Sequence, residues 1–165
     1  MNSSLSIQDS VQLFNMLSTQ HEDWIVARAM EIVEQRVFRR DLSLIDSEAT
    51  KNYLRVKLAE QRNEVFVALF MDAQNRVIAY EELFKGTVSQ AVVYPRGVLA
   101  KALEHNAASV IFSHNHPSGV TTPSEVDKVL TAELKTVLAA IDVRVLDHVI
   151  IGQGEPFSFA EMGLL

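Results

Sequence analysis

Two histidines and an aspartate in the second half of the chain are the residues whose types and spacing could do chemistry. His114 and His116 end an apolar run that is typical of a buried strand. Side chains alternate along a strand, so both imidazoles project from one face with their Cα atoms about 6.5 Å apart. Two nitrogens so placed can bind one ion at about 2.0–2.1 Å. Asp127, after a turn rich in glycine and proline, supplies a third ligand and leaves a fourth position for water, as catalytic zinc sites require.

The same segment has a simpler interpretation, in which it only begins a helix. Ser124 followed three positions later by an acidic residue is a common helix start. We favour Thr122 as the N-cap, because Pro123 then takes the first helical position and Glu125 closes the capping box. Ser124 and Asp127 are then free and share one face of the first turn. We therefore expect that face to look into a metal site.

The spacing His114-x-His116-x7-Ser124-x2-Asp127 resembles the JAMM motif of MPN/JAB-domain metalloproteases across the whole motif. Neighbouring segments resemble the bacterial RadC-like branch of these proteins. The segments that carry this resemblance are residues 82–87, 114–119, 147–152 and 157–161. The resemblance covers roughly residues 46–165 and is to the short, stand-alone members, because the chain is too short to hold the helix-hairpin-helix region of longer RadC-type proteins.

The chain departs from the family's usual sequence at one place. Residues 94–97 read Tyr-Pro-Arg-Gly, where the family usually reads His-Pro-Arg-Glu. A role that the family ties to that histidine and glutamate is therefore not carried over to Tyr94 or Gly97. We expect substrate selection to lie in the loops around residues 85–91 and 117–122.

The resemblance also implies a glutamate on an earlier element that acts as general base for water activated by zinc. Glu64 directly precedes the first buried strand and is our preferred candidate, while Glu81 and Glu82 end the second strand and stay open as alternatives. An ordinary solvated carboxylate is the simpler interpretation of each. Ser124 is expected to donate a hydrogen bond to the oxyanion. The implied reaction is hydrolysis of a peptide or isopeptide bond in a protein or peptide substrate.

Apolar periodicity predicts an α/β fold, with a mixed sheet flanked by helices, and the resemblance implies MPN/JAB-like, cytidine-deaminase-like layering. A helical N-terminal extension, residues 1–45, precedes the catalytic domain, residues 46–165, and is expected to serve a peripheral role such as homodimer contacts. The predicted helices cover about residues 7–20, 22–40, 46–60, 95–106 and 123–140, and the predicted strands cover 65–71, 77–80, 91–94, 109–112 and 143–151.

Composition limits the class of protein. The 165 residues and 48% hydrophobic content fit one globular domain. The chain has no cysteine, so metal ligands must be imidazole and carboxylate, and we expect a cytoplasmic protein. No leader peptide is recognisable, and the longest apolar run, residues 65–71, is far shorter than the roughly 20 residues of a membrane span.

Two other function classes remain as alternatives. Fifteen basic against twenty-one acidic residues give a net charge of −6, which disfavours nucleic acid as a partner, although the RadC name is linked to DNA repair. A non-catalytic protein-interaction module is the other alternative, and the complete set of motif residues argues against it. His148, in the last long strand, either orients a metal ligand from behind or is a hydrogen-bonded core histidine.

Overall fold

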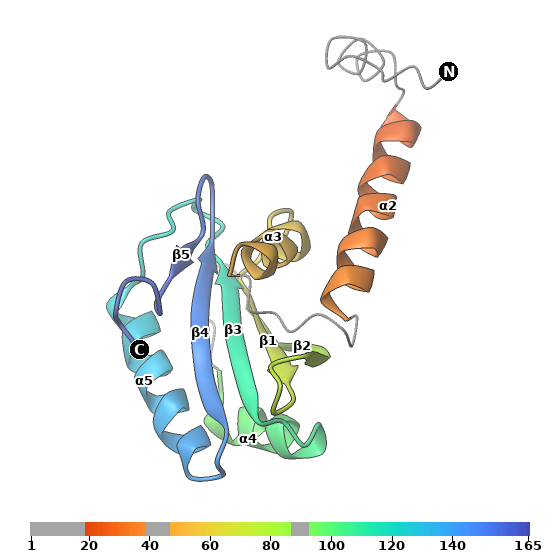
Figure 1. Cartoon of the computed structure of the whole chain (residues 1–165). Coiled ribbons are helices and arrows are strands. Elements are labelled where there is room, and N and C mark those ends of the chain that lie inside the picture. The colour runs from red at the N-terminus through yellow and green to blue at the C-terminus, as the bar shows by residue number, and fades with distance from the viewer. Residues whose placement is uncertain (1–18, 39–46, 87–92) are drawn as a thin grey trace.

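A five-stranded mixed sheet forms the centre of the molecule (Figure 1). The computed structural model describes residues 19–38, 47–86 and 93–165. The strand order is β2-β1-β3-β4-β5. The helices are α2 (Thr19–Val37), α3 (Ser47–Leu58), α4 (Pro95–Glu104) and α5 (Glu125–Ala139), and the strands are β1 (Val65–Met71), β2 (Val77–Lys85), β3 (Ser109–Asn115), β4 (Arg144–Ile151) and β5 (Phe157–Ser158).

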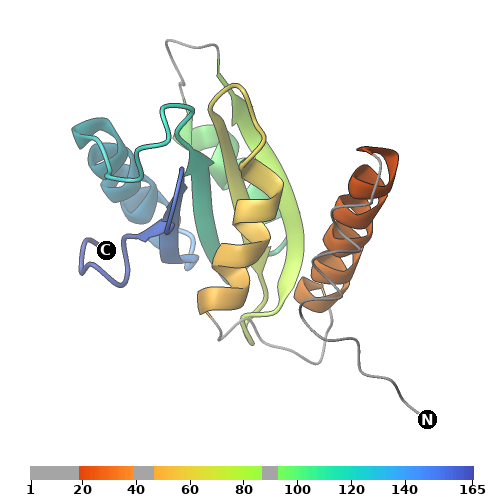
Figure 2. The ribbon, with the colours of Figure 1, turned by 90° about the horizontal axis from the view of Figure 1, so that it is seen from above.

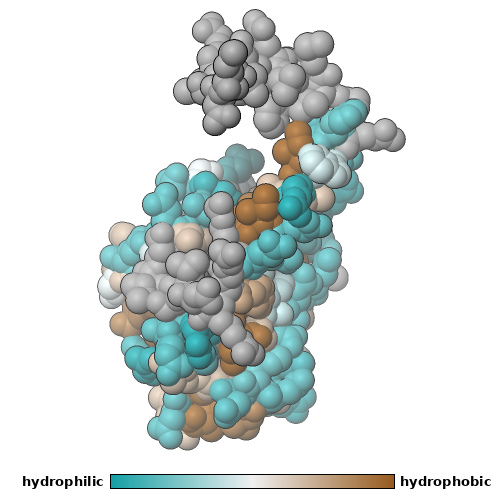
Figure 3. Space-filling model, turned by 45° about the vertical axis from the view of Figure 1, so that its right-hand side comes forward, coloured by the Kyte–Doolittle hydropathy of each residue, from teal (hydrophilic) through white to brown (hydrophobic). Residues whose placement is uncertain are grey.

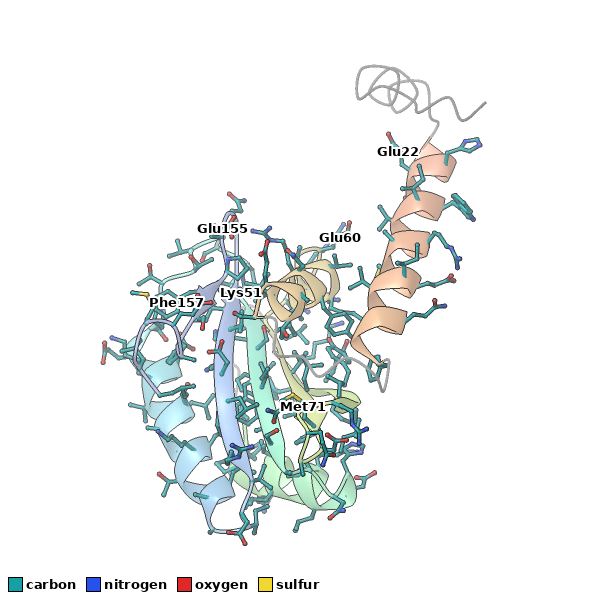
Figure 4. All side chains as sticks on the ribbon, in the orientation of Figure 1. Glu22, Lys51, Glu60, Met71, Glu155 and Phe157 are labelled. Atoms are coloured by element: carbon teal, nitrogen blue, oxygen red, sulfur yellow. The ribbon has the colours of Figure 1, made fainter. Side chains whose placement is uncertain are left out.

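Strand directions explain why the catalytic candidates meet at one end of the sheet. β1 pairs antiparallel with both β2 and β3, whereas β3 and β4 run parallel. The start of β1 therefore lies at the same end of the sheet as the ends of β2, β3 and β4. Figure 4 shows Glu60 and Glu155 at this end and Met71 towards the opposite one. The prediction of a mixed α/β sheet is confirmed.

Helices cover both faces of the sheet, with α3 on one side and α4 and α5 on the other (Figure 2). All seven residues of β1 and of β3 are buried, which accounts for the uninterrupted apolar run in β1. On the α3 side, Tyr53, Leu54 and Leu58 pack against the sheet. On the other side, Leu134 and Leu138 of α5 are fully buried, and burial of each leucine contributes about 2 kcal/mol.

Most predicted elements are observed, with differences at their ends. β2 continues to Lys85, beyond the predicted 77–80. A β-bulge at Leu83 follows the two glutamates, and the strand remains paired with β1 on both sides of the bulge. Of the strand predicted over 91–94, only Val93 and Tyr94 are described, and neither is in a strand. Tyr94 is extended, as expected of a residue before proline, and caps α4. The two-residue β5 was not predicted.

Helix α2 extends away from the body and contacts α3 (Figures 1 and 3). Lys57 of α3 forms an ion pair with Glu34 of α2, and Val33 packs against the core on that side. Trp24 remains 66% exposed. The helix predicted over residues 7–20 lies almost wholly outside the described residues. Among the described helices, none has the length and apolar character needed to cross a membrane.

Candidate metal centre

The predicted ligands His114, His116 and Asp127 come together at the end of β3. The two Nε2 atoms lie 2.9 Å apart. Oδ1 of Asp127 is 3.3 Å from Nε2 of His114, and Oδ2 is 3.6 Å from Nε2 of His116. A tetrahedral ion with ligands at 2.0–2.1 Å needs neighbouring ligand atoms about 3.3–3.4 Å apart. These residues therefore form a His-His-Asp group that fits one metal ion.

A buried chain of hydrogen bonds fixes the tautomer of His114. The Thr131 hydroxyl donates to the Asp127 carbonyl at 2.6 Å, so the same oxygen accepts from Nδ1 of His148, also at 2.6 Å. Nε2 of His148 then has no proton and accepts from Nδ1 of His114 at 2.9 Å. With its proton on Nδ1, neutral His114 presents a lone pair on Nε2 to the site.

His116 is held in the same tautomer by a different partner. Its Nδ1 lies 2.6 Å from the carbonyl oxygen of Val120, which can only accept, so Nδ1 carries the proton. Nε2 of neutral His116 therefore also has a lone pair, directed at the lone pair of His114 across 2.9 Å. Two such lone pairs repel unless a cation lies between them. The donor set thus calls for a metal ion, or for a proton in its place.

The electrostatics of the group favour a cation. Burial acts to raise the pKa of the Asp127 carboxyl, but its interactions with His114 and His116 and the hydrogen bond from Ser124 outweigh burial and hold that pKa well below its usual range. The hydrogen bond with Asp127 raises the pKa of His116, against the effect of burial. Complete burial is the main reason that the pKa of His148 lies well below its ordinary value. His148 is therefore neutral, as its hydrogen bonds require.

The predicted helix cap at Thr122 is wrong. Helix α5 starts at Glu125, and Ser124 is its N-cap with extended backbone angles of φ −74° and ψ 167°. Oγ of Ser124 accepts from the Asp127 amide at 3.2 Å, and Oδ2 of Asp127 accepts from the Ser124 amide at 2.6 Å and from its hydroxyl at 2.7 Å. Pro123 thus precedes the cap. Ser124 and Asp127 are not free: the capping box itself presents the aspartate to the histidines.

Glu64 lies beside this group. At this end of the sheet the last pair between β1 and β3 is Phe66 with His114, so Glu64 lies two residues before Phe66 and His116 two residues after His114. Alternation along an extended chain is expected to turn Glu64 to the face of Phe66 and His114. The carboxylate is half-buried, and its charge contributes to the raised pKa of His116.

The alternative glutamates lie elsewhere. Glu81 accepts a hydrogen bond from His105 at 2.8 Å, which is the main reason for its lowered pKa. His105 is thus paired with Glu81. Glu82 is exposed and stands opposite Val67, whose side chain packs on the α3 side of the sheet. Neither glutamate is brought to the His-His-Asp group.

Asn115, which lies between the two histidines in the sequence, has a structural role on the opposite face of the sheet. Its side chain points to the other face, where Oδ1 accepts from the Val65 amide at 2.8 Å. Nδ2 donates to the carbonyls of Gln61 at 3.2 Å and Asn63 at 3.0 Å. These bonds hold the segment that carries Glu64 against the end of β3. Thr131 was also missed, although it lies one helical turn after Asp127 on the same face of α5.

Comparison with known proteins supports the resemblance. The family model of the RadC-like JAB domain matches residues 44–164. A UPF0758 protein of Azotobacter vinelandii is 55% identical over 127 residues, which are 77% of this chain and 57% of that protein. One from Albidiferax ferrireducens is 52% identical over 139 residues (84% and 57%), and one from Nitrosospira multiformis is 59% identical over 113 (68% and 50%).

The chain spans only about half the length of these curated relatives. Family membership therefore applies to the matched domain, residues 44–164, which contains the His-His-Asp group. With a match over most of its length, this chain belongs to the family of RadC-like JAB domains.

Proposed function

We propose that this chain is a zinc-dependent hydrolase that cleaves a peptide or isopeptide bond. The observation that carries the proposal is the pair of Nε2 atoms of His114 and His116, both without a proton and converging beside an ionised Asp127. Imidazole and carboxylate are common zinc ligands, and three protein ligands leave room for a reacting group. Zinc held there would act as a Lewis acid and lower the pKa of an adjacent water to about 7.

Glu64 is proposed as the general base. Its place two residues before Phe66, close enough for its charge to act on His116, supports a role in taking a proton from water and passing it to the leaving amine. Asn115 supports that role by holding the segment before β1.

Ser124 is proposed to stabilise the oxyanion. Its hydroxyl donates to Asp127 at 2.7 Å, so it must turn its proton from the carboxylate to the substrate. A hydrogen bond of this kind, made in the transition state, typically contributes about 3 kcal/mol.

The test compares Glu64→Gln with Glu60→Gln, an exposed glutamate four residues earlier in the chain. Both zinc-loaded variants and the unmodified protein are incubated with a proteome-derived peptide library, and new amino termini are identified by mass spectrometry. We expect cleavage by the unmodified protein and by Glu60→Gln, and none by Glu64→Gln, with equal zinc content in all three. Equal cleavage by both variants would remove Glu64 from the mechanism, and no cleavage by any zinc-loaded protein would contradict peptide hydrolysis.

A further inference from the structure

We propose that a groove between β2 and α4 is a specificity subsite that takes a bulky apolar side chain of the substrate. This proposal rests on the proposed hydrolase function. The groove has a volume of about 230 Å³. Its lining residues are Glu82, Leu83, Phe84, Val93, Tyr94, Gly97, Val98 and Lys101.

The groove and the metal ligands share one face of the sheet. Phe84 stands opposite Phe66, which stands opposite His114 on the next strand. The Phe66 ring stacks on the His114 ring with centroids 6.0 Å apart, so an aromatic row leads from the groove to the metal ligand. Two strand spacings of about 4.8 Å place Phe84 about 10 Å from His114. An extended peptide covers that distance in about three residues, so the groove can read a side chain close to the scissile bond.

Two of the lining residues give the groove room and an aromatic rim. Gly97 leaves open space, since a Cβ atom built there would meet no atom within 4 Å. Tyr94 is 60% exposed at the rim and has the Arg96 guanidinium 5.6 Å from its ring centroid. An apolar side chain of the substrate can therefore lie beside Gly97 and contact the Tyr94 ring.

Lys101, the basic residue that lines the groove, does not offer a free partner for an acidic substrate. Lys101 contacts Glu81 at 3.3 Å and Glu104 at 3.1 Å, so its charge is already balanced. The floor is formed by apolar side chains, among them Val98, which is 1% exposed. An apolar side chain is therefore the substrate group that this groove fits, and Gly97 is the residue that sets its size.

Substitutions at Gly97 test the proposal without disturbing the core. Gly97→Leu fills the groove, and Gly97→Glu adds a carboxylate to it. Leucine and glutamate both favour a helix more than glycine does. Ala132→Leu adds similar bulk at an exposed position of α5 and serves as the control. We expect the zinc-loaded protein to cleave library peptides with leucine, phenylalanine or methionine enriched within three residues of the cut. Both Gly97 variants should lower kcat/KM for such peptides by about 10- to 100-fold, and Gly97→Leu should shift the preference to small residues.

A binding measurement separates this proposal from the hydrolase function. Amide NMR shifts are recorded while N-acetyl-phenylalanine amide or N-acetyl-aspartate amide is added to the protein. We expect the aromatic probe alone to shift Leu83 and Val98, and this shift to disappear in Gly97→Leu but not in Ala132→Leu. Such a shift without any peptide cleavage would support the groove and contradict the hydrolase. No shift, or cleavage with the same side-chain preference in all variants, would overturn the groove.

Discussion

Replacing Thr131 by valine removes one hydroxyl group from the interior of the site and keeps the shape of the side chain. In the native protein this hydroxyl donates to the Asp127 carbonyl and accepts from Nδ1 of His148. Without it, Nδ1 of His148 has no acceptor among these partners. His148 can avoid an unpaired N–H by moving its proton to Nε2, which forces the proton of His114 onto the nitrogen that faces the metal.

The magnitude follows from the cost of an unpaired buried N–H, about 1–3 kcal/mol. His148 is fully buried, so water cannot replace the lost acceptor. Zinc binding requires His114 to carry its proton on Nδ1, which returns the proton of His148 to its unpaired Nδ1. Zinc binding in the variant therefore includes the free-energy cost of this unpaired N–H. At about 1.4 kcal/mol for each tenfold change, zinc affinity should fall by about 5- to 140-fold.

Competition with a chromophoric zinc chelator measures this affinity at neutral pH. Thr136→Val is a matched control, because Thr136 donates to the carbonyl of Ala132 at 2.8 Å, the same hydrogen bond in the same helix, and is exposed. Its zinc affinity should stay within about twofold of the unmodified protein. Equal affinity of the two valine variants, both shown to be folded by circular dichroism, would refute the tautomer argument.

Three further predictions concern the same site. Asn115→Ala should lower the free energy of unfolding by about 2–4 kcal/mol in urea denaturation, because it removes three hydrogen bonds, one of them buried; a loss under 1 kcal/mol would contradict its role. Gly152→Ala should weaken zinc binding in the chelator assay, because the new Cβ would lie 2.5 Å from the Gly119 carbonyl oxygen and displace the loop. The Val120 carbonyl of this loop orients His116. Unchanged zinc binding would contradict the role of the loop in orienting His116. Zinc affinity should fall about tenfold per pH unit below the raised pKa of His116, because the proton bound to His116 at low pH must leave before zinc binds. Calorimetry in buffers of different ionisation enthalpy should detect that released proton. If no proton is released in that pH range, His116 is not the ligand that titrates.

The meeting of the three ligands was predictable because it depends on local rules. Alternation along a strand puts His114 and His116 on one face, and a short turn returns the chain so that Asp127 enters at the start of the next helix. The error at Thr122 arose because two overlapping capping boxes fit the sequence. In the structure Ser124 is the N-cap, and its capping box also orients the metal ligand Asp127.

The parts that sequence reasoning could not reach depend on contacts between distant residues. The role of His148 depends on the parallel pairing of β3 with β4 and on the Thr131 hydroxyl, 17 residues away. No periodicity in the sequence specifies that tautomer chain. The departure at residues 94–97 was visible in the sequence, but its place beside the Phe84–Phe66–His114 row required the register of three strands.

Metal content tests the central claim most directly. Tag-free protein and His116→Ala are purified in parallel, and zinc is measured by elemental analysis before and after incubation with zinc and removal of the excess. The geometry of the His-His-Asp group predicts about one zinc per chain in the unmodified protein and none in the variant. A folded, unmodified protein that contains no metal and takes up no zinc would contradict the metal centre and, with it, the proposed hydrolase.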